Sequence, residues 1–245
     1  GAADVRASAC IDLMERTPQR DMIENAKGEL MRQFDTILFD LDGTLTDSSV
    51  GITTTIQMTL AHYGVEQPLE NLFRFIGPPL DECFSQYLPA RQVDEAIAHY
   101  RARYTTVGLY ENEVYPGIHE MLGALKAGGL RLAVSTSKPK NTSLDILSHF
   151  ELDAYFDVIE GASGDGRVKS KRDVIELALA HFEGLDRSRT VIVGDRLHDM
   201  EGAKLCGISA IGVLWGFGGF EELSAYRPLL LAKTPDEVTR YLLGA

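Results

Sequence analysis

Short apolar runs alternate with segments of helical period along most of this chain. The pattern predicts strands at Thr36–Phe39, Leu130–Ser135, Phe156–Ile159, Thr190–Val193 and Ala210–Leu214. Between and after them it predicts helices at Ile118–Ala127, Asn141–Phe150, Arg172–Phe182, His198–Cys206 and Pro235–Leu243. Strands that alternate with helices indicate an α/β fold, in which helices cover both faces of a parallel sheet.

The stretch between the first strand and Tyr115 has a different pattern. Apolar positions at helical spacing predict a helix at Val50–Tyr63 and further helical segments at Leu69–Ile76, Pro79–Leu88 and Arg91–Thr105. No strand is predicted between Asp47 and Tyr115. We therefore expect a core of residues 34–46 and 116–245, with residues 47–115 as a small all-helical domain inserted after the first strand.

The first 33 residues differ from the rest, because they are mixed and charged and carry no recognisable chemistry. We expect residues 1–33 to form an N-terminal extension that is disordered or contains a short helix around Met22–Met31.

Composition limits the partners. The chain has 245 residues, 44% of them hydrophobic, and a net charge of −12. Proteins that bind nucleic acid polymers gather Lys and Arg, so the acidic balance argues against that function. The negative net charge does not exclude a small anionic ligand, because a bound metal can make one site locally positive.

Cysteine spacing and hydropathy limit the compartment. Cys10, Cys83 and Cys206 lie far apart, which indicates neither a disulfide framework nor a zinc site. No apolar run approaches the roughly 18 residues of a membrane helix, and the start has no signal-peptide pattern. We therefore expect a cytoplasmic protein without a membrane partner.

Two carboxylates follow the first predicted strand. Asp40 and Asp42 are two positions apart, so they project to the same side of an extended chain. They lie at the carboxyl end of the strand, which is where open α/β sheets bind their ligands. An Asp-Gly turn at a strand end is also common without any chemistry. Two acids at one site need a cation or a shared proton, and they can take different chemical roles.

Two further strands end in polar residues, and their ends meet the first at the same edge of a parallel sheet. One leads into Ser135, Thr136, Ser137 and Lys138, and the other into Asp195 and Asp199. Asp40, Asp195 and Asp199 supply the hard oxygen ligands that Mg²⁺ prefers. Thr136 is a candidate donor to a phosphoryl oxygen, although Ser135 precedes it. Lys171 is the candidate phosphate-binding cation, with Lys169 and Lys138 as alternatives.

Together these motifs resemble the haloacid dehalogenase-like (HAD) superfamily over about Phe34 to Ala245. The four matching motifs are Asp40-x-Asp42-Gly43-Thr44-Leu45-Thr46, Thr136, Lys171, and Gly194-Asp195-x-x-x-Asp199. The helical insertion resembles the cap that this family places after its first motif. Two further segments, Phe75–Leu80 and Gly212–Gly218, are similar to the phosphoglycolate phosphatase, pyrophosphatase and 5′-nucleotidase-like branch.

The resemblance implies a Rossmann-like core and a Mg²⁺-dependent phosphatase. Asp40 would attack phosphorus and form an aspartyl-phosphate. Asp42 would act as general acid and base. The resemblance implies Mg²⁺ ligands at Asp40, Asp195, Asp199 and the main-chain carbonyl of Asp42. It implies phosphate contacts from Gly43, Thr136, Ser137 and Lys171.

The resemblance also separates rival reactions. Dehalogenases of the family lack the second acid, so Asp42 argues against them. Phosphonate-cleaving relatives need a cap lysine, and residues 47–115 contain none. A sugar phosphomutase and a catalytically silent binding protein stay open. A dinucleotide-binding dehydrogenase is disfavoured, because no Gly-x-Gly-x-x-Gly follows a strand.

The substrate itself is not fixed by the motifs. We expect a small phosphorylated metabolite and phosphoglycolate phosphatase-like activity, with 5′-nucleotidase or pyrophosphatase activity as the alternatives. Arg74 is our candidate in the cap for binding an anionic group of the substrate, because a guanidinium can grip a carboxylate or phosphate with two bonds. We expect a monomer or a dimer.

Overall fold

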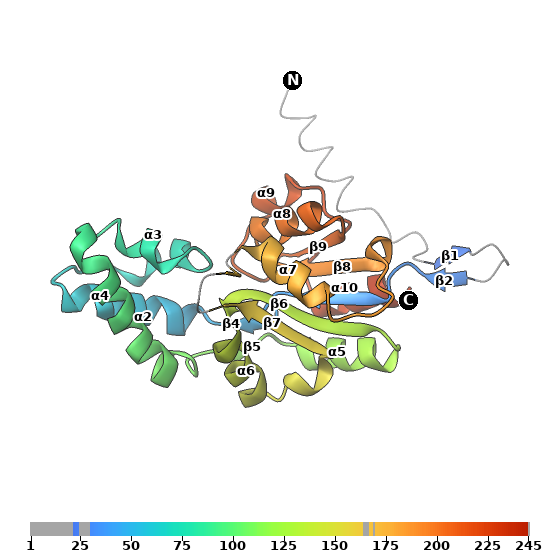
Figure 1. The fold of residues 1–245 in the computed structure, drawn as a ribbon, viewed down its shortest axis with the longest axis horizontal. Helices are drawn as coiled ribbons and strands as arrows, with labels where there is room; N and C mark the ends of the chain where they lie inside the picture. The colour runs from blue at the N-terminus through green and yellow to red at the C-terminus, as the bar shows by residue number, and fades with distance from the viewer. Residues whose placement is uncertain (1–21, 25–29, 164–166, 169, 245) are drawn as a thin grey trace, which may run out of the picture.

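The core of the molecule is a six-stranded sheet. The computed structural model describes residues 22–24, 30–163, 167–168 and 170–244, and in this part every neighbouring pair of the sheet is parallel, in the order β10-β9-β8-β3-β6-β7 (Figure 1). The strands are β3 Thr36–Phe39, β6 Arg131–Pro139, β7 Val158–Ala162, β8 Thr190–Gly194, β9 Ser209–Val213 and β10 Leu231–Ala232. The expected parallel α/β fold is confirmed. The two-residue strand β10 is too short for the sequence pattern to predict.

Helices cover both faces of this sheet because successive side chains of its strands alternate. On β3, Ile37 and Phe39 belong to one hydrophobic core and Leu38 to the other. The first core is closed by α5 Ile118–Ala127, α6 Lys140–His149 and α10 Pro235–Leu243. The second is closed by α7 Lys171–Leu179 and α8 Leu197–Cys206, and α9 Phe220–Ser224 lies beside α8. The central strand is therefore buried on both sides.

A helical segment projects from one end of the sheet (Figure 1). It comprises α2 Ser49–His62, α3 Leu80–Phe84 and α4 Ala90–Arg103, and α4 continues into a π-helical turn at Tyr104–Gly108. Two short 3₁₀ turns, Leu69–Asn71 and Phe73–Phe75, occupy the range expected to be one helix. We call residues 48–112 the cap.

The cap joins the core through two short strands. β4 Thr46–Asp47 leads into the cap, and β5 Glu113–Val114 leads out of it. They pair antiparallel, with Thr46 opposite Val114 and Asp47 opposite Glu113. The expectation of no strand between Asp47 and Tyr115 is therefore wrong. Two-residue strands are too short to show alternation, and their pairing joins segments that are distant in sequence.

The expected helix at Met22–Met31 is wrong where the structure describes it. β1 Met22–Glu24 and β2 Leu30–Arg32 pair antiparallel, with Ile23 opposite Met31. Apolar runs of this length fit a strand or a helix equally well, so pairing decides between them. The expectations for residues 1–21 lie outside the described part of the chain.

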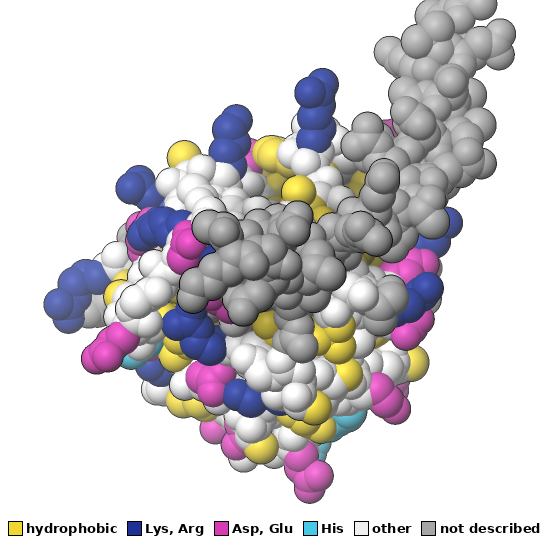
Figure 2. All heavy atoms as spheres, turned by 90° about the vertical axis from the view of Figure 1, so that its right-hand side faces the viewer, with side chains coloured by type: hydrophobic (Ala, Val, Ile, Leu, Met, Phe, Trp, Pro, Cys, Tyr) yellow, Lys and Arg dark blue, Asp and Glu magenta, His cyan; other side chains and the backbone are white. Residues whose placement is uncertain are grey.

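The end of the core away from the cap has a mixed surface. On the face shown in Figure 2, Lys and Arg side chains are scattered among Asp and Glu side chains of the described residues. None of the described helices combines the length and hydropathy of a membrane span.

Candidate active site

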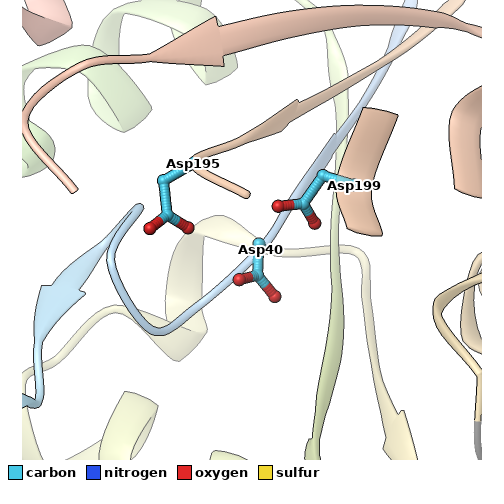
Figure 3. Close-up of side chains that lie close together, drawn as sticks. All are labelled: Asp40, Asp195 and Asp199. Carbon is cyan, nitrogen blue, oxygen red and sulfur yellow. The ribbon is translucent and has the colours of Figure 1, made fainter. Parts of the chain in front are cut away.

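Three carboxylates converge at the carboxyl edge of the sheet. Asp40 follows β3, Asp195 follows β8, and Asp199 lies in the first turn of α8. One oxygen of each lies within 4.8 Å of the others, and the three side chains lie close together (Figure 3). They meet because β3 and β8 are neighbouring parallel strands, with Phe39 opposite Val193.

Lys171 reaches this group from a third element. It is the first residue of α7, whose start is held by Ser170, because the Ser170 hydroxyl accepts a bond from the Asp173 N–H. The Lys171 Nζ lies 2.5 Å from Asp40 Oδ1 and 2.7 Å from Asp199 Oδ1. One ammonium group thus bridges two of the three acids.

The charges at this group do not balance. Burial raises the pKa of Asp40 to about 6, although Lys171 opposes the shift, and burial with the neighbouring Asp199 and Asp40 raises the pKa of Asp195 well above its usual value. Burial alone would lower the pKa of Lys171, but Asp199 and Asp40 raise it. Three buried carboxylates against one lysine leave an excess of negative charge, and an all-carboxylate set suits a hard divalent cation such as Mg²⁺.

The loop of the first motif packs tightly on Asp195. The Phe217 N–H donates to Asp195 Oδ2 at 2.8 Å, and Thr44 Oγ1 donates to Oδ1 at 3.3 Å. Gly43 has a φ of +84°, and a Cβ there would lie 2.1 Å from Asp195 Oδ2. Trp215 Nε1 donates to the Thr44 carbonyl at 3.0 Å. Only glycine fits at position 43, so Gly43 shapes the site through its backbone.

The second acid of the first motif faces a different partner. The carboxylate of Asp42 lies outside the group of three, and its Oδ2 is 3.1 Å from the Nζ of Lys138. The same Nζ donates to Tyr104 Oη of the cap at 2.7 Å. Burial alone would lower the pKa of Lys138, but Asp42 and Tyr104 raise it. Asp42 Oδ1 is buried without a hydrogen-bond partner among the described residues.

The three hydroxyl side chains of β6, those of Ser135, Thr136 and Ser137, differ in their surroundings. Thr136 is buried, and its Oγ1 accepts a bond from the Lys138 N–H at 3.2 Å, so the hydroxyl proton is available to a ligand. Ser135 is fully buried, and its hydroxyl has no partner among the described residues. Ser137 is exposed. Lys169, the alternative to Lys171, lies outside the described residues.

Arg74 is not joined to this group. It is exposed, and its Nη2 donates to Gln86 Oε1 at 3.1 Å and to Tyr87 Oη at 3.2 Å, both in the cap. With Tyr87 and three other cap residues it lines a hollow of about 430 Å³.

Sequence reasoning missed two residues near the site. Tyr104 belongs to no motif, and only its place in the cap could have suggested a contact with the core. Lys138 was considered only as an alternative to Lys171, whereas it faces Asp42. Tyr104 lies near the end of the expected helical segment Arg91–Thr105, and nothing in that pattern indicates its contact with Lys138.

Known proteins are similar to this chain in sequence. The model of the family described as haloacid dehalogenase-like hydrolase matches residues 37–213. A 5′-nucleotidase of Pseudomonas aeruginosa is 44% identical over 199 residues, which cover 80% of this chain and 90% of that protein. The tyrosine-protein kinase PtkA of Mycobacterium tuberculosis is 41% identical over 209 residues, which cover 84% of this chain and 72% of that protein.

A solved structure extends the likeness to three dimensions. A haloacid dehalogenase-like hydrolase from Streptococcus pneumoniae superposes with a TM-score of 0.81 at 36% identity, over 86% of this chain and 99% of that one. The family match and the likeness of fold point the same way. The chain therefore belongs to the haloacid dehalogenase-like hydrolases and is a phosphatase.

Proposed function

We propose that this protein is a Mg²⁺-dependent phosphatase that hydrolyses a small phosphate monoester through an aspartyl-phosphate on Asp40. The observation that carries the proposal is the convergence of Asp40, Asp195 and Asp199 beside Lys171, with Asp42 held apart from them. A purely structural cluster would pair its charges more evenly, because unpaired buried carboxylates are costly.

The residues fit a divalent cation. Asp40 and Asp195 would hold it, with Asp199 and the main-chain carbonyl of Asp42 as further ligands. Bound Mg²⁺ supplies positive charge between the nucleophile and the phosphate, which otherwise repel each other.

In the first step, an oxygen of Asp40 attacks phosphorus and the bond to the leaving alkoxide breaks. Asp42 gives its proton to that alkoxide, so the product leaves as an alcohol. Lys171 and Thr136 bind non-bridging oxygens of the phosphoryl group and stabilise their charge.

In the second step, water attacks the phosphorus of the aspartyl-phosphate, and the bond to Asp40 breaks. Asp42, now ionised, takes a proton from that water, which yields inorganic phosphate and restores both acids. Asp42 lies beside the cap residue Tyr104 through their shared contact with Lys138. Asp42 therefore lies between the core and the cap, and this position supports its proposed role in proton transfer both to the leaving group and from the attacking water.

The substrate belongs to the small phosphorylated metabolites. The 5′-nucleotidase relative favours nucleoside 5′-monophosphates as the first class to test. Phosphoglycolate, sugar phosphates and pyrophosphate complete the panel, because the motif resemblance includes enzymes for the first and last of these.

The decisive experiment measures phosphate release from this panel with and without Mg²⁺, for the wild type and for Asp40→Asn. The variant keeps the size of the side chain and removes the nucleophilic charge, so turnover should fall to background. Asp145→Asn, at an exposed acid of α6, is the matched control and should retain full turnover. Near-wild-type turnover of a well-folded Asp40→Asn protein would refute the mechanism.

The same panel separates the rivals. A phosphomutase would move phosphate between positions of a sugar and release little inorganic phosphate. A silent binding protein would release none from any ester. Transfer from ATP to a tyrosine peptide in preference to water would favour the activity named for the mycobacterial relative.

A further inference from the structure

The turn that follows the cap's second 3₁₀ segment leaves one carbonyl without a local donor. Ile76 is buried, and Gly77, Pro78 and Pro79 follow it. In a tight turn the Ile76 carbonyl would accept from residue 78 or 79, but proline has no N–H. Its hydrogen bond has to come from outside the turn.

Arg196 of the core supplies that bond. Its Nη1 donates to the Ile76 carbonyl at 2.6 Å. Arg196 lies between Asp195 and Asp199 in sequence, and its backbone N–H donates to Asp199 Oδ2 at 3.0 Å. Gly77 has a φ of +103°, and a Cβ there would lie 3.2 Å from Nη1, so the glycine allows the close approach.

The guanidinium of Arg196 is held in this direction. Glu222 Oε1 accepts from Arg196 Nε at 3.0 Å and from the Leu197 N–H at 2.8 Å. The Arg196 side chain is 19% exposed, so the bonds are partly shielded from water. One carboxylate thus fixes both the side chain and the start of α8, which carries Asp199.

We propose that Arg196 is a positioning residue that holds the Ile76–Pro79 turn of the cap against the loop of Asp195 and Asp199. The contact keeps the cap closed over the carboxylates and couples the cap's position to the order of that loop. Its catalytic consequence rests on the proposed function, whereas the contact itself can be tested without any activity.

The first test measures hydrogen exchange in metal-free protein. Arg196→Ala removes the guanidinium but keeps the backbone bonds of Arg196 to Asp199 and of Leu197 to Glu222. We expect the amides of Phe75 and Ile76, which bond within the cap, to exchange about tenfold faster or more. Amides of β8 should keep their wild-type rates.

Arg187 provides the matched control. It also binds a glutamate, Glu176, and a backbone carbonyl, that of Cys206, but both lie in the core. Arg187→Ala should leave the exchange of Phe75 and Ile76 unchanged. If Arg196→Ala does not fold, Glu222→Gln serves instead, because it weakens the anchor of Arg196 and should raise the same two rates.

The second test is kinetic and uses p-nitrophenyl phosphate with Mg²⁺. When the binding-competent arrangement is populated for only a fraction of the time, the apparent affinity falls by that fraction. We expect Arg196→Ala to raise KM about tenfold and to change kcat by less than about twofold. Simple loss of folded enzyme would lower kcat and leave KM alone.

Unchanged exchange at Phe75 and Ile76 in Arg196→Ala would overturn the proposal, and so would an equal increase in β8. Absence of phosphatase activity in the wild type would refute the proposed function but would leave the exchange result standing. The two failures are therefore distinguishable.

Discussion

Asp195 shows how a single buried residue can tie folding to ligand binding. Its side chain is fully buried, and its neighbours include two more carboxylates. Burial first, and then Asp199 and Asp40, make its ionised form unfavourable and raise its pKa. The metal-free protein therefore carries a local electrostatic cost, and a cation that binds the three acids removes it.

We expect Asp195→Asn to be more heat-stable than the wild type in the absence of divalent cations. The amide keeps the size of the side chain and removes the repelled charge. A thermal melt in EDTA should show a Tm that is higher by a few degrees, and Mg²⁺ should raise the Tm of the wild type but not that of the variant. A Tm of the variant that is lower in EDTA would show that Asp195 is not under repulsion.

The dependence of the phosphorylation rate on the leaving group tests the role of Asp42. Proton donation matters most when the leaving alkoxide is a strong base. In rapid-mixing experiments, Asp42→Asn should slow phosphorylation by an alkyl phosphate at least about tenfold more than by p-nitrophenyl phosphate. Equal losses with both substrates would contradict general-acid catalysis by Asp42.

At the scale of elements, the opposite edge of the sheet is held together by Asp35. It precedes β3, and its carboxylate accepts from Arg131 of β6 at 3.0 Å and from Arg189, which precedes β8, at 3.0 Å. Burial alone would raise the pKa of Asp35, but hydrogen bonds from Thr36, Arg189 and Arg131 lower it. One carboxylate therefore links the three central strands where they begin.

This link predicts a pH dependence of stability. A lowered pKa means that the unfolded chain binds the proton more readily, so the stabilisation is present above the ordinary value of 3.8 and is lost as the pH falls below it. Asp35→Asn should lower the Tm at pH 7, and the difference from wild type should shrink toward about pH 3. Asp145→Asn, at an exposed acid, should follow the wild-type curve. A constant difference across this range would exclude the linkage.

Sequence patterns predicted the elements that are long and periodic. The bounds of α5 and α10 agree with the expected helices, and β3 and β8 lie where the apolar runs are. The side chains within each of these elements determine its type and its place along the chain. The short strands β4 and β5 could not be predicted, because each is two residues long and is defined by its pairing with the other.

The same distinction applies to the site. The sequence alone predicted that Asp40, Asp195 and Asp199 lie close together, because the carboxyl ends of parallel strands meet at one edge of a sheet. The contact of Lys138 with Tyr104 and that of Arg196 with Ile76 both cross from core to cap. The geometry of both contacts depends on how the cap packs on the core, and no local sequence pattern predicts that packing.

At the scale of the whole molecule, the cap and the core meet beside the candidate site as well as through β4 and β5. Lys138 lies on β6, the strand that carries Thr136, and Arg196 follows Asp195, so each side-chain bridge starts close to a residue of the site. Lys138 also contacts Asp42, so the proposed general acid shares a partner with the cap residue Tyr104. Closing the cap and arranging the acids are thus connected events.

Tyr104→Phe tests the first of these bridges. It removes the hydroxyl that accepts the bond from Lys138 and keeps the ring that packs in the cap. We expect KM for p-nitrophenyl phosphate to rise several-fold with kcat nearly unchanged. Tyr110→Phe, at an exposed tyrosine of the cap whose ring packs on His149, is the matched control and should leave both constants unchanged. A fall in kcat alone would assign Tyr104 to the chemical step instead.

The strand order also dictates when the protein can become active during its synthesis. β3 is the earliest strand of the six to leave the ribosome, yet it lies at the centre, and its neighbours β6 and β8 begin only at Arg131 and Thr190. The cap, whose helices pack mainly on one another, can fold while β3 still waits for both neighbours. Because Asp199 is translated later still, a nascent chain carries Asp40, the proposed nucleophile, for most of its synthesis without the other two carboxylates of the site. If the proposed mechanism holds, we expect no hydrolysis from a nascent chain that ends before Asp199.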